Sequence, residues 1–158
     1  MAHYAKFSEN NEILGVHTLD NKNEQNESGE TVEALGQAYL EQHSNWPANL
    51  WKKCSYNTNS TPTGSVHTLG GTPYRGVYPS KGMEWDEANQ VFRRKQPYTS
   101  WSFNTTSLKW DPPIAPPETT TNIGGRDMPD FYDWDEALYQ SDNTKGWVKD
   151  DNAEYPAV

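Results

Sequence analysis

The sequence has few aliphatic side chains, a single cysteine and no long apolar segment. Of its 158 residues 33% are hydrophobic, and the mean hydropathy is -1.02. The lone Cys54 excludes an internal disulfide framework. No stretch approaches the roughly 20 apolar residues of a transmembrane helix, and Met1 to Lys6 leads into no apolar run of signal-peptide length. We therefore expect a soluble protein, made in a reducing cytoplasm, with no membrane partner.

Positive charge is also scarce. Lys and Arg number 13 against 22 Asp and Glu, so the formal net charge is -9. Binding to a nucleic-acid backbone needs clustered Lys and Arg, so we expect no nucleic-acid partner. The low hydropathy approaches that of disordered chains, which indicates that a partner surface contributes to stability.

Aromatic residues are abundant, at 13% of the chain, with seven Trp and nine Tyr. Three segments share one pattern, in which an aromatic residue is followed by Asp or Asn and later by a second aromatic residue. They are EWDEANQVF (84–92), FNTTSLKW (103–110) and WDEALYQSDNTKGWV (134–148). Asp or Asn after a strand favours an Asx-turn, and rings on the two flanking strands can pair across a hairpin. The pattern predicts the ring pairs Trp85/Phe92, Phe103/Trp110 and Trp134/Trp147, the last with a turn about six residues longer.

Two further elements are predicted in the N-terminal part. HYAKF and ILGVHTL alternate in polarity around a turn-rich SENNE, which predicts a hairpin over 3–8 and 12–18. Apolar residues at helical spacing predict one α-helix over about 30–43, with Ser28 or Thr31 as its N-cap.

The rest of the chain is rich in turn residues. A short strand is predicted within LWKKCSYN (50–57), and long turn-rich loops follow it. The fold class is thus mainly β: a small antiparallel sheet of aromatic-clipped hairpins, in which a pair of rings holds the two strands together, with one inserted helix. We divide the chain into a hairpin domain (1–115), a Pro/Thr/Gly-rich linker (116–130) and a C-terminal hairpin with an acidic tail (131–158).

Residues that could carry chemistry do not converge on a recognisable motif. Cys54 and His67 could act as nucleophile and base, but ordinary strand and loop residues explain them more simply. The adjacent acids Asp86/Glu87 and Asp135/Glu136 are interpreted as solvated turns rather than catalytic carboxylates. We expect no enzymatic activity, no catalytic residue, no cofactor and no metal. Exposed Trp rings could instead stack on sugars, as in glycan-binding modules.

A chain this polar is expected to bind its partner through a few Tyr and Arg anchors rather than a large apolar patch. Two segments supply such residues, the loop GTPYRGVYP and the basic cluster near residue 94. The partner-contact candidates are Tyr74, Arg75, Tyr78, Arg93, Arg94, Lys95 and Tyr98.

Several short blocks, in order, resemble a family of virion-associated proteins from marine tailed bacteriophages, chiefly cyanophages. They are MAHYAKF, NNEILGVHTL, SYNTNS with VHTLGGTPYRGVY, and VFRRKQPYTSWSFNTTSLKWDPP, over roughly residues 1–115. The sequence departs from the family pattern at Arg93 and Arg94, where apolar residues and proline are usual, and at Thr99, where a second proline is common.

The resemblance implies a virion structural protein with no catalytic motif to carry over. The first expectation is a knob-like or cement-type decoration protein on the outer capsid surface, bound to other virion proteins such as the major capsid protein. The alternative is a tail- or fibre-associated adhesion module that binds host glycans.

Overall fold

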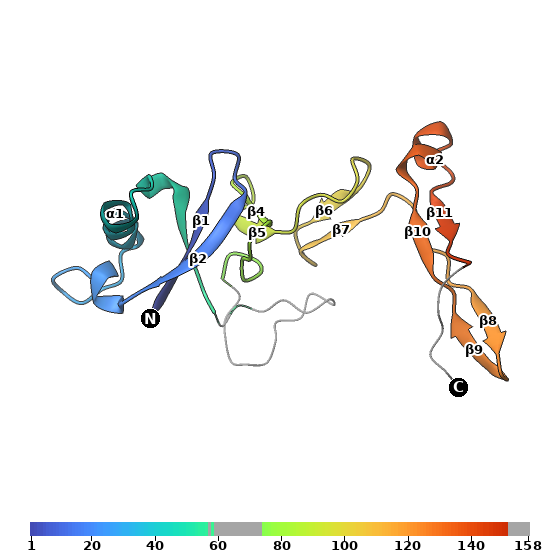
Figure 1. The fold of residues 1–158 in the computed structure, drawn as a ribbon, viewed down its shortest axis with the longest axis horizontal. Helices are drawn as coiled ribbons and strands as arrows, with labels where there is room; N and C mark the ends of the chain where they lie inside the picture. The colour runs from blue at the N-terminus through green and yellow to red at the C-terminus, as the bar shows by residue number, and fades with distance from the viewer. Residues whose placement is uncertain (57, 59–73, 152–158) are drawn as a thin grey trace. The chain divides into compact units, whose positions relative to one another are not determined.

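Strand β1 is the centre of a three-stranded antiparallel sheet (Figure 1). The structure, a computed structural model, describes residues 1–56, 58 and 74–151. Strands β1 (Ala2–Phe7) and β2 (Ile13–Leu19) form the predicted N-terminal hairpin, and β3 (Trp51–Cys54) pairs with the other side of β1. The strand order is therefore β2-β1-β3, and the predictions of the hairpin and of the short strand are confirmed.

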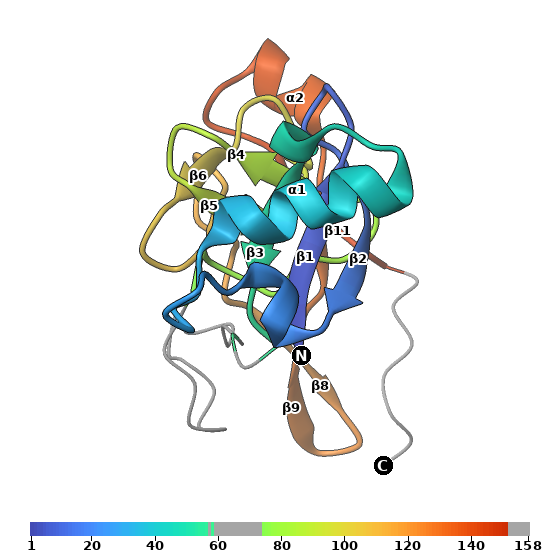
Figure 2. The same cartoon turned by 90° about the vertical axis from the view of Figure 1, so that its left-hand side faces the viewer.

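One face of this sheet is covered by helix α1 (Glu33–Ser44), which crosses in front of the strands in Figure 2. Tyr4 and Trp51 point to this face and are fully buried with Leu40 of the helix. A side chain at Gly36 would collide with the ring of Tyr4, so the helix can approach the sheet only because that position is glycine.

The opposite face is covered by the hairpin of β4 (Glu84–Asp86) and β5 (Val91–Arg93). Successive residues of a strand point to opposite faces, so Ala5 lies on the other side from Tyr4. It is buried in one cluster with Trp85 and Phe92. A sheet buried on both faces explains how a chain with so few aliphatic residues still forms a core.

Helix α1 confirms the predicted helix but begins later than expected. Its N-cap is Val32, which makes no capping hydrogen bond through its side chain, so the predicted caps Ser28 and Thr31 are wrong. The side chain of Asn26 instead accepts hydrogen bonds from the backbone N–H groups of Ser28 and Glu30. This closes a separate turn before the helix. Two short 3-10 segments, Asn21–Glu24 and Ala48–Leu50, flank the helix on either side.

The first aromatic hairpin forms as predicted. Trp85 lies directly opposite Phe92, with the ring centroids 4.8 Å apart. The predicted Asx-turn is present, because the carboxylate of Asp86 accepts hydrogen bonds from the backbone and side chain of Asn89. The ring pair Trp85/Phe92 is therefore confirmed.

The second hairpin consists of β6 (Ser102–Asn104) and β7 (Lys109–Asp111). The side chain of Asn104 accepts the backbone N–H groups of Thr106 and Ser107, as the sequence pattern predicts for the turn. The pairing of the rings of Phe103 and Trp110 stays a prediction.

The third hairpin pairs β10 (Tyr132–Trp134) with β11 (Trp147–Lys149). Trp134 lies opposite Trp147, with centroids 5.2 Å apart in an edge-to-face arrangement, which confirms that pair. The connection is not a longer turn, as predicted, but contains helix α2 (Glu136–Ser141). Asp135 caps this helix by accepting the N–H of Leu138.

A fourth hairpin, unexpected from the sequence, lies within the segment predicted as a linker. Strands β8 (Thr120–Ile123) and β9 (Arg126–Pro129) pair antiparallel. Gly124 and Gly125 both have positive φ, and Asn122 accepts the N–H of Gly125 in the turn. A two-stranded ribbon has only edge strands, so Pro129 at its end removes no central hydrogen bond.

The described chain forms two compact units. Unit 1 comprises Met1–Lys95 and Phe103–Lys109, and unit 2 comprises Gln96–Ser102 and Trp110–Val158. Their charges differ greatly: unit 1 has ten Lys and Arg against eleven Asp and Glu, a net charge of -1. Unit 2 has three against eleven, a net charge of -8. The two units have the same number of acidic residues, but almost all of the net negative charge of the protein belongs to unit 2, because most Lys and Arg lie in unit 1.

Candidate functional site

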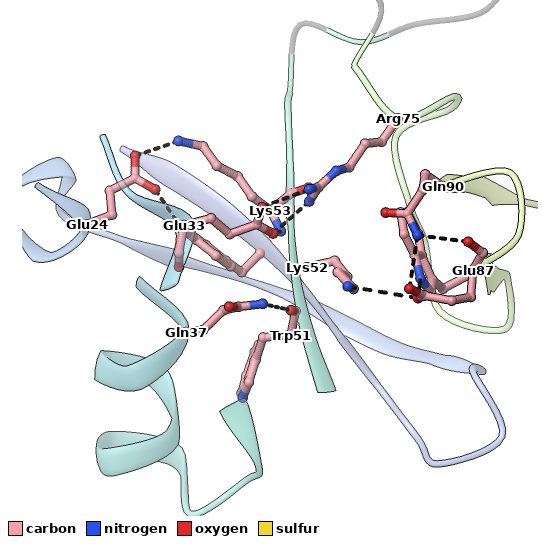
Figure 3. A network of polar contacts seen from close by, with 11 residues as sticks. Glu24, Glu33, Gln37, Trp51, Lys52, Lys53, Arg75, Glu87 and Gln90 are labelled. Atoms are coloured by element: carbon pink, nitrogen blue, oxygen red, sulfur yellow. Dashed lines mark hydrogen bonds and ion pairs between the residues drawn. The ribbon is translucent and has the colours of Figure 1, made fainter. Parts of the chain in front are cut away.

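The outer edge of β3 is closed by side chains instead of by another strand (Figure 3). Gln37 of α1 donates to the carbonyl of Trp51 at 2.6 Å. The backbone N–H of Lys53 donates to Oε1 of Glu33 at 2.8 Å, and Arg75 donates to the carbonyl of Lys53 at 3.0 Å. An open strand edge is a template for pairing with another chain, and these three bonds remove that possibility at β3.

We call the side chains that close the β3 edge (Glu33, Gln37 and Arg75) the edge cap. Glu33 and Arg75 form its centre. The guanidinium donates to both carboxylate oxygens, at 2.6 and 2.7 Å, in the bidentate geometry that makes such pairs strong. The two side chains are 26% and 21% exposed. Burial alone would raise the pKa of Glu33, but the hydrogen bonds from Arg75 and from the backbone of Lys53 outweigh it and lower the pKa. Glu33 is therefore held as a carboxylate.

A second carboxylate, Glu24, is 3% exposed on the same side of the sheet. Its two oxygens accept separate hydrogen bonds, one from the hydroxyl of Tyr4 and one from Nζ of Lys53, both at 2.8 Å. Burial and the hydrogen bond to this carboxylate raise the pKa of Tyr4 well above its ordinary value. Glu24 thus ties the loop before α1 to β1 and β3.

The acids of the first aromatic hairpin are also paired. Asp86 is 8% exposed and forms an ion pair with Arg93 at 2.6 Å, so its interpretation as a solvated turn residue is wrong. Burial alone would raise the pKa of Asp86. The hydrogen bonds from Asn89 and the charge of Arg93 outweigh that effect, so the pKa lies below its ordinary value. The neighbouring Glu87 accepts the indole N–H of Trp85 at 2.5 Å.

The second predicted acid pair has structural contacts in unit 2. Asp135 caps α2, and Glu136 accepts hydrogen bonds from Ser100, Trp134 and other donors. The bond from Ser100 makes the largest contribution in lowering the pKa of Glu136 to about 2. Glu136 is therefore an ionised hydrogen-bond acceptor and lacks the raised pKa of a general acid.

The partner-contact candidates lie in unit 1, except Tyr98, which belongs to unit 2. Arg75 is paired with Glu33, and Lys95 forms an ion pair with Glu12 at 2.9 Å. Further contacts include those of Arg93 with Glu84, of Tyr78 with His3, of the Tyr74 backbone with Thr58, and of the ring of Tyr98 with that of Trp101. The contact of these residues with a partner stays a prediction, and Arg75 and Arg93 already hold parts of unit 1 together.

An exposed ring lies beside one of these candidates. Tyr56 is 73% exposed, and its ring contacts those of His3 and Tyr78, with all three centroid distances between 5.9 and 6.0 Å. A flat, supported aromatic ring is suited to stacking on another flat or apolar surface.

Cys54 is 3% exposed within the core, and burial raises the pKa of its thiol to about 12. Its proposed partner His67 lies outside the described residues. The thiolate is the reactive species, and at neutral pH a pKa raised this far leaves far less thiolate than an ordinary cysteine has. The environment therefore disfavours a nucleophilic role.

We expect Cys54 in the folded protein to react with a thiol reagent at least about a hundredfold more slowly than in denaturant, because it is both buried and protonated. The measurement is the rate of labelling by a chromogenic disulfide at pH 8, with and without urea. Labelling of the folded protein at the unfolded rate would contradict the buried position and revive the nucleophile hypothesis.

Comparison of the sequence and structure with protein-family models, curated proteins and solved structures gave no match. Within the described residues, no three His, Cys, Asp or Glu side chains are grouped closely enough to hold a metal ion. The helices of the same part of the chain are all too short or too polar to cross a bilayer.

The sequence did not point to the edge cap. Glu24, Glu33, Gln37 and Lys53 were singled out by no motif, and Arg75 was selected only as a binding anchor. The one available signal was an acidic residue in the first turn of the predicted helix, Glu33. Such a residue is ordinarily explained by the helix dipole alone.

Proposed function

We propose that this protein is a structural component of a bacteriophage virion, and that it decorates the outer surface of the capsid. Its partners on this proposal are other virion proteins, the major capsid protein first among them. The proposal starts from the resemblance of residues 1–115 to virion-associated proteins of marine tailed phages.

The observation that carries the proposal is the unequal charge of the two units. Unit 1, at -1, can approach another protein surface without long-range repulsion, whereas unit 2, at -8, repels acidic surfaces and DNA. A protein with one nearly neutral and one strongly acidic unit is suited to binding by the first and remaining hydrated through the second. This division supports a place on the exterior of a particle, away from packaged DNA.

The use of the polar side chains agrees with a structural role. Glu24 and Asp86 are buried and Glu33 is partly buried, and each binds a cation that lies far from it in sequence or on a neighbouring strand. Such pairs hold loops and strands in one arrangement. A rigid surface of this kind lowers the entropy lost on binding.

The test is a phage that lacks the gene for this protein. We expect its particles to assemble and package DNA but to lose a small protrusion from the capsid, visible by cryo-electron microscopy against wild-type particles. Supplying the gene in trans is the control and should restore the protrusion, with a copy number that follows the capsid lattice.

The exposed ring of Tyr56 favours a second candidate, an adhesion module of the tail or fibre that binds host glycans. Sugar rings stack on flat aromatic side chains, and the ring of Tyr56 is in contact with those of His3 and Tyr78. The same particle distinguishes the two candidates. If the missing density lies at the tail and host adsorption falls, the capsid proposal is wrong and the adhesion module takes its place.

A further inference from the structure

The two edges of the three-stranded sheet differ in whether their backbone groups are hydrogen-bonded. The β3 edge is closed by Glu33, Gln37 and Arg75, as described above. The β2 edge has backbone partners only at its start, where Ile13 exchanges hydrogen bonds with Gly82 and Met83. From Gly15 onward, β2 has no neighbour in the described chain on the side away from β1.

The pairing register of the three strands shows which backbone groups of β2 face that open side. Both the N–H and the carbonyl of Lys53 point away from β1, because they bind Glu33 and Arg75. Its partner Tyr4 therefore turns its own groups toward His17 on β2. Because the direction alternates along a strand, the N–H and C=O groups of Val16 and Thr18 face outward.

Strand β2 lacks the residues that usually prevent an edge strand from pairing with another chain. The strand reads ILGVHTL, without a charged residue or a proline, the two features that most often protect a strand edge. Leu14, His17 and Thr18 are exposed, and a side chain placed on Gly15 would meet nothing within 4 Å. The edge is thus sterically open and electrically neutral.

We infer that β2 is an interaction surface at which a second copy of this protein adds its own β2 antiparallel, continuing the sheet across a two-fold axis. In this arrangement Val16 pairs with Thr18 of the second copy and Thr18 with Val16 of the second copy. Each pair exchanges both N–H···O=C bonds, so every outward group of these residues finds a partner.

A second copy is favoured over an unrelated strand for two reasons. The edge is complementary to itself, since β2 has no Asp, Glu, Lys or Arg that would meet a like charge of the second copy, and unit 1 adds a net charge of only -1 from each copy. Because the β3 edge is closed, pairing at β2 uses the one edge of this sheet that the described residues leave open, and it stops at two copies. The inference does not depend on the proposed virion role.

The contact is small, so we expect a dimer that dissociates on dilution, as interfaces below about 1,200 Å² do. The purified full chain is examined by sedimentation equilibrium over a wide concentration range, and amide hydrogen exchange is measured at both ends of it. Val16 and Thr18 should gain protection only at high concentration, whereas His17, which faces β1, should be protected throughout.

Thr18→Pro is the decisive variant, because it removes an outward N–H and leaves the pairing with β1 intact. We expect dimerisation to weaken by roughly tenfold or more. Thr18→Ala keeps the N–H and is the matched control, which should dimerise like the wild type. If Thr18→Pro does not fold, the hydrogen-exchange pattern of the wild type decides.

Three results would overturn the inference. One is a monomer at every concentration, and another is growth beyond a dimer. The third is protection of Val16 and Thr18 in the dilute monomer, which would mean that the edge is already occupied by this chain itself.

Discussion

Trp85→Ala should lower the free energy of unfolding of unit 1 by about 3–5 kcal/mol, the usual cost of removing a buried large aromatic side chain. Trp85 is 2% exposed and packs against Phe92, which is fully buried. Its loss would leave a cavity between the hairpin and the three-stranded sheet. It would also deprive Glu87 of the indole N–H that it accepts. Urea unfolding followed by circular dichroism measures the change.

Tyr56→Ala is the matched control for this experiment, since it also truncates a large aromatic residue of unit 1. Tyr56 is 73% exposed, and surface substitutions usually change stability by less than about 0.5 kcal/mol. A Trp85→Ala protein that unfolds at the same urea concentration as Tyr56→Ala would mean that the hairpin β4–β5 does not cover the sheet.

Arg75→Met should cost about 2–3 kcal/mol of stability, less than the 3–5 kcal/mol known for fully buried pairs because this pair is partly exposed. Methionine keeps much of the apolar stem but removes the bidentate bond to Glu33 and the bond to the carbonyl of Lys53. Both the carboxylate and the edge of β3 are then left without these donors. The measurement is again urea unfolding at pH 7.

The dependence on pH separates this ion pair from simple packing. Glu33 has a pKa below its ordinary 4.5 in the folded protein, so its contribution is present above that value and is lost as the pH falls through the folded pKa. Without Arg75, the pKa of Glu33 loses the hydrogen bonds and the charge of the guanidinium that lower it and should rise relative to the wild type, so the stability difference between Arg75→Met and the wild type should shrink in acid. A difference that stays constant down to pH 3 would mean that the pair contributes through packing alone.

Lys95→Met is the control for the ion pair. Lys95 and Glu12 also form a pair in unit 1, but their side chains are 51% and 45% exposed. Exposed pairs of this kind contribute between about 0 and 1 kcal/mol. A loss as large as that of Arg75→Met would show that net charge, rather than the closed edge of β3, is responsible.

The elements that could be predicted are those specified by neighbouring residues. The Trp85/Phe92 and Trp134/Trp147 pairs follow from an aromatic residue, an Asp and a return strand, all within one hairpin. The errors arose where two local signals competed. Asn26 forms its own turn and takes the place of the predicted helix caps, and the proline-rich stretch concealed the Gly124–Gly125 turn of β8–β9.

The sequence by itself determined the mainly β class, the pairs of aromatic rings across the hairpins and the net negative charge. These features follow from the alternation of polar and apolar residues, from the turn residues and from composition, all of which can be read from short segments. Only the tertiary structure decided what the charged residues do. Glu33 and Arg75 are 42 positions apart and meet because the helix and the loop converge on the edge of β3. Which strand edge is closed and which is open depends on such distant contacts, and no local pattern encodes them.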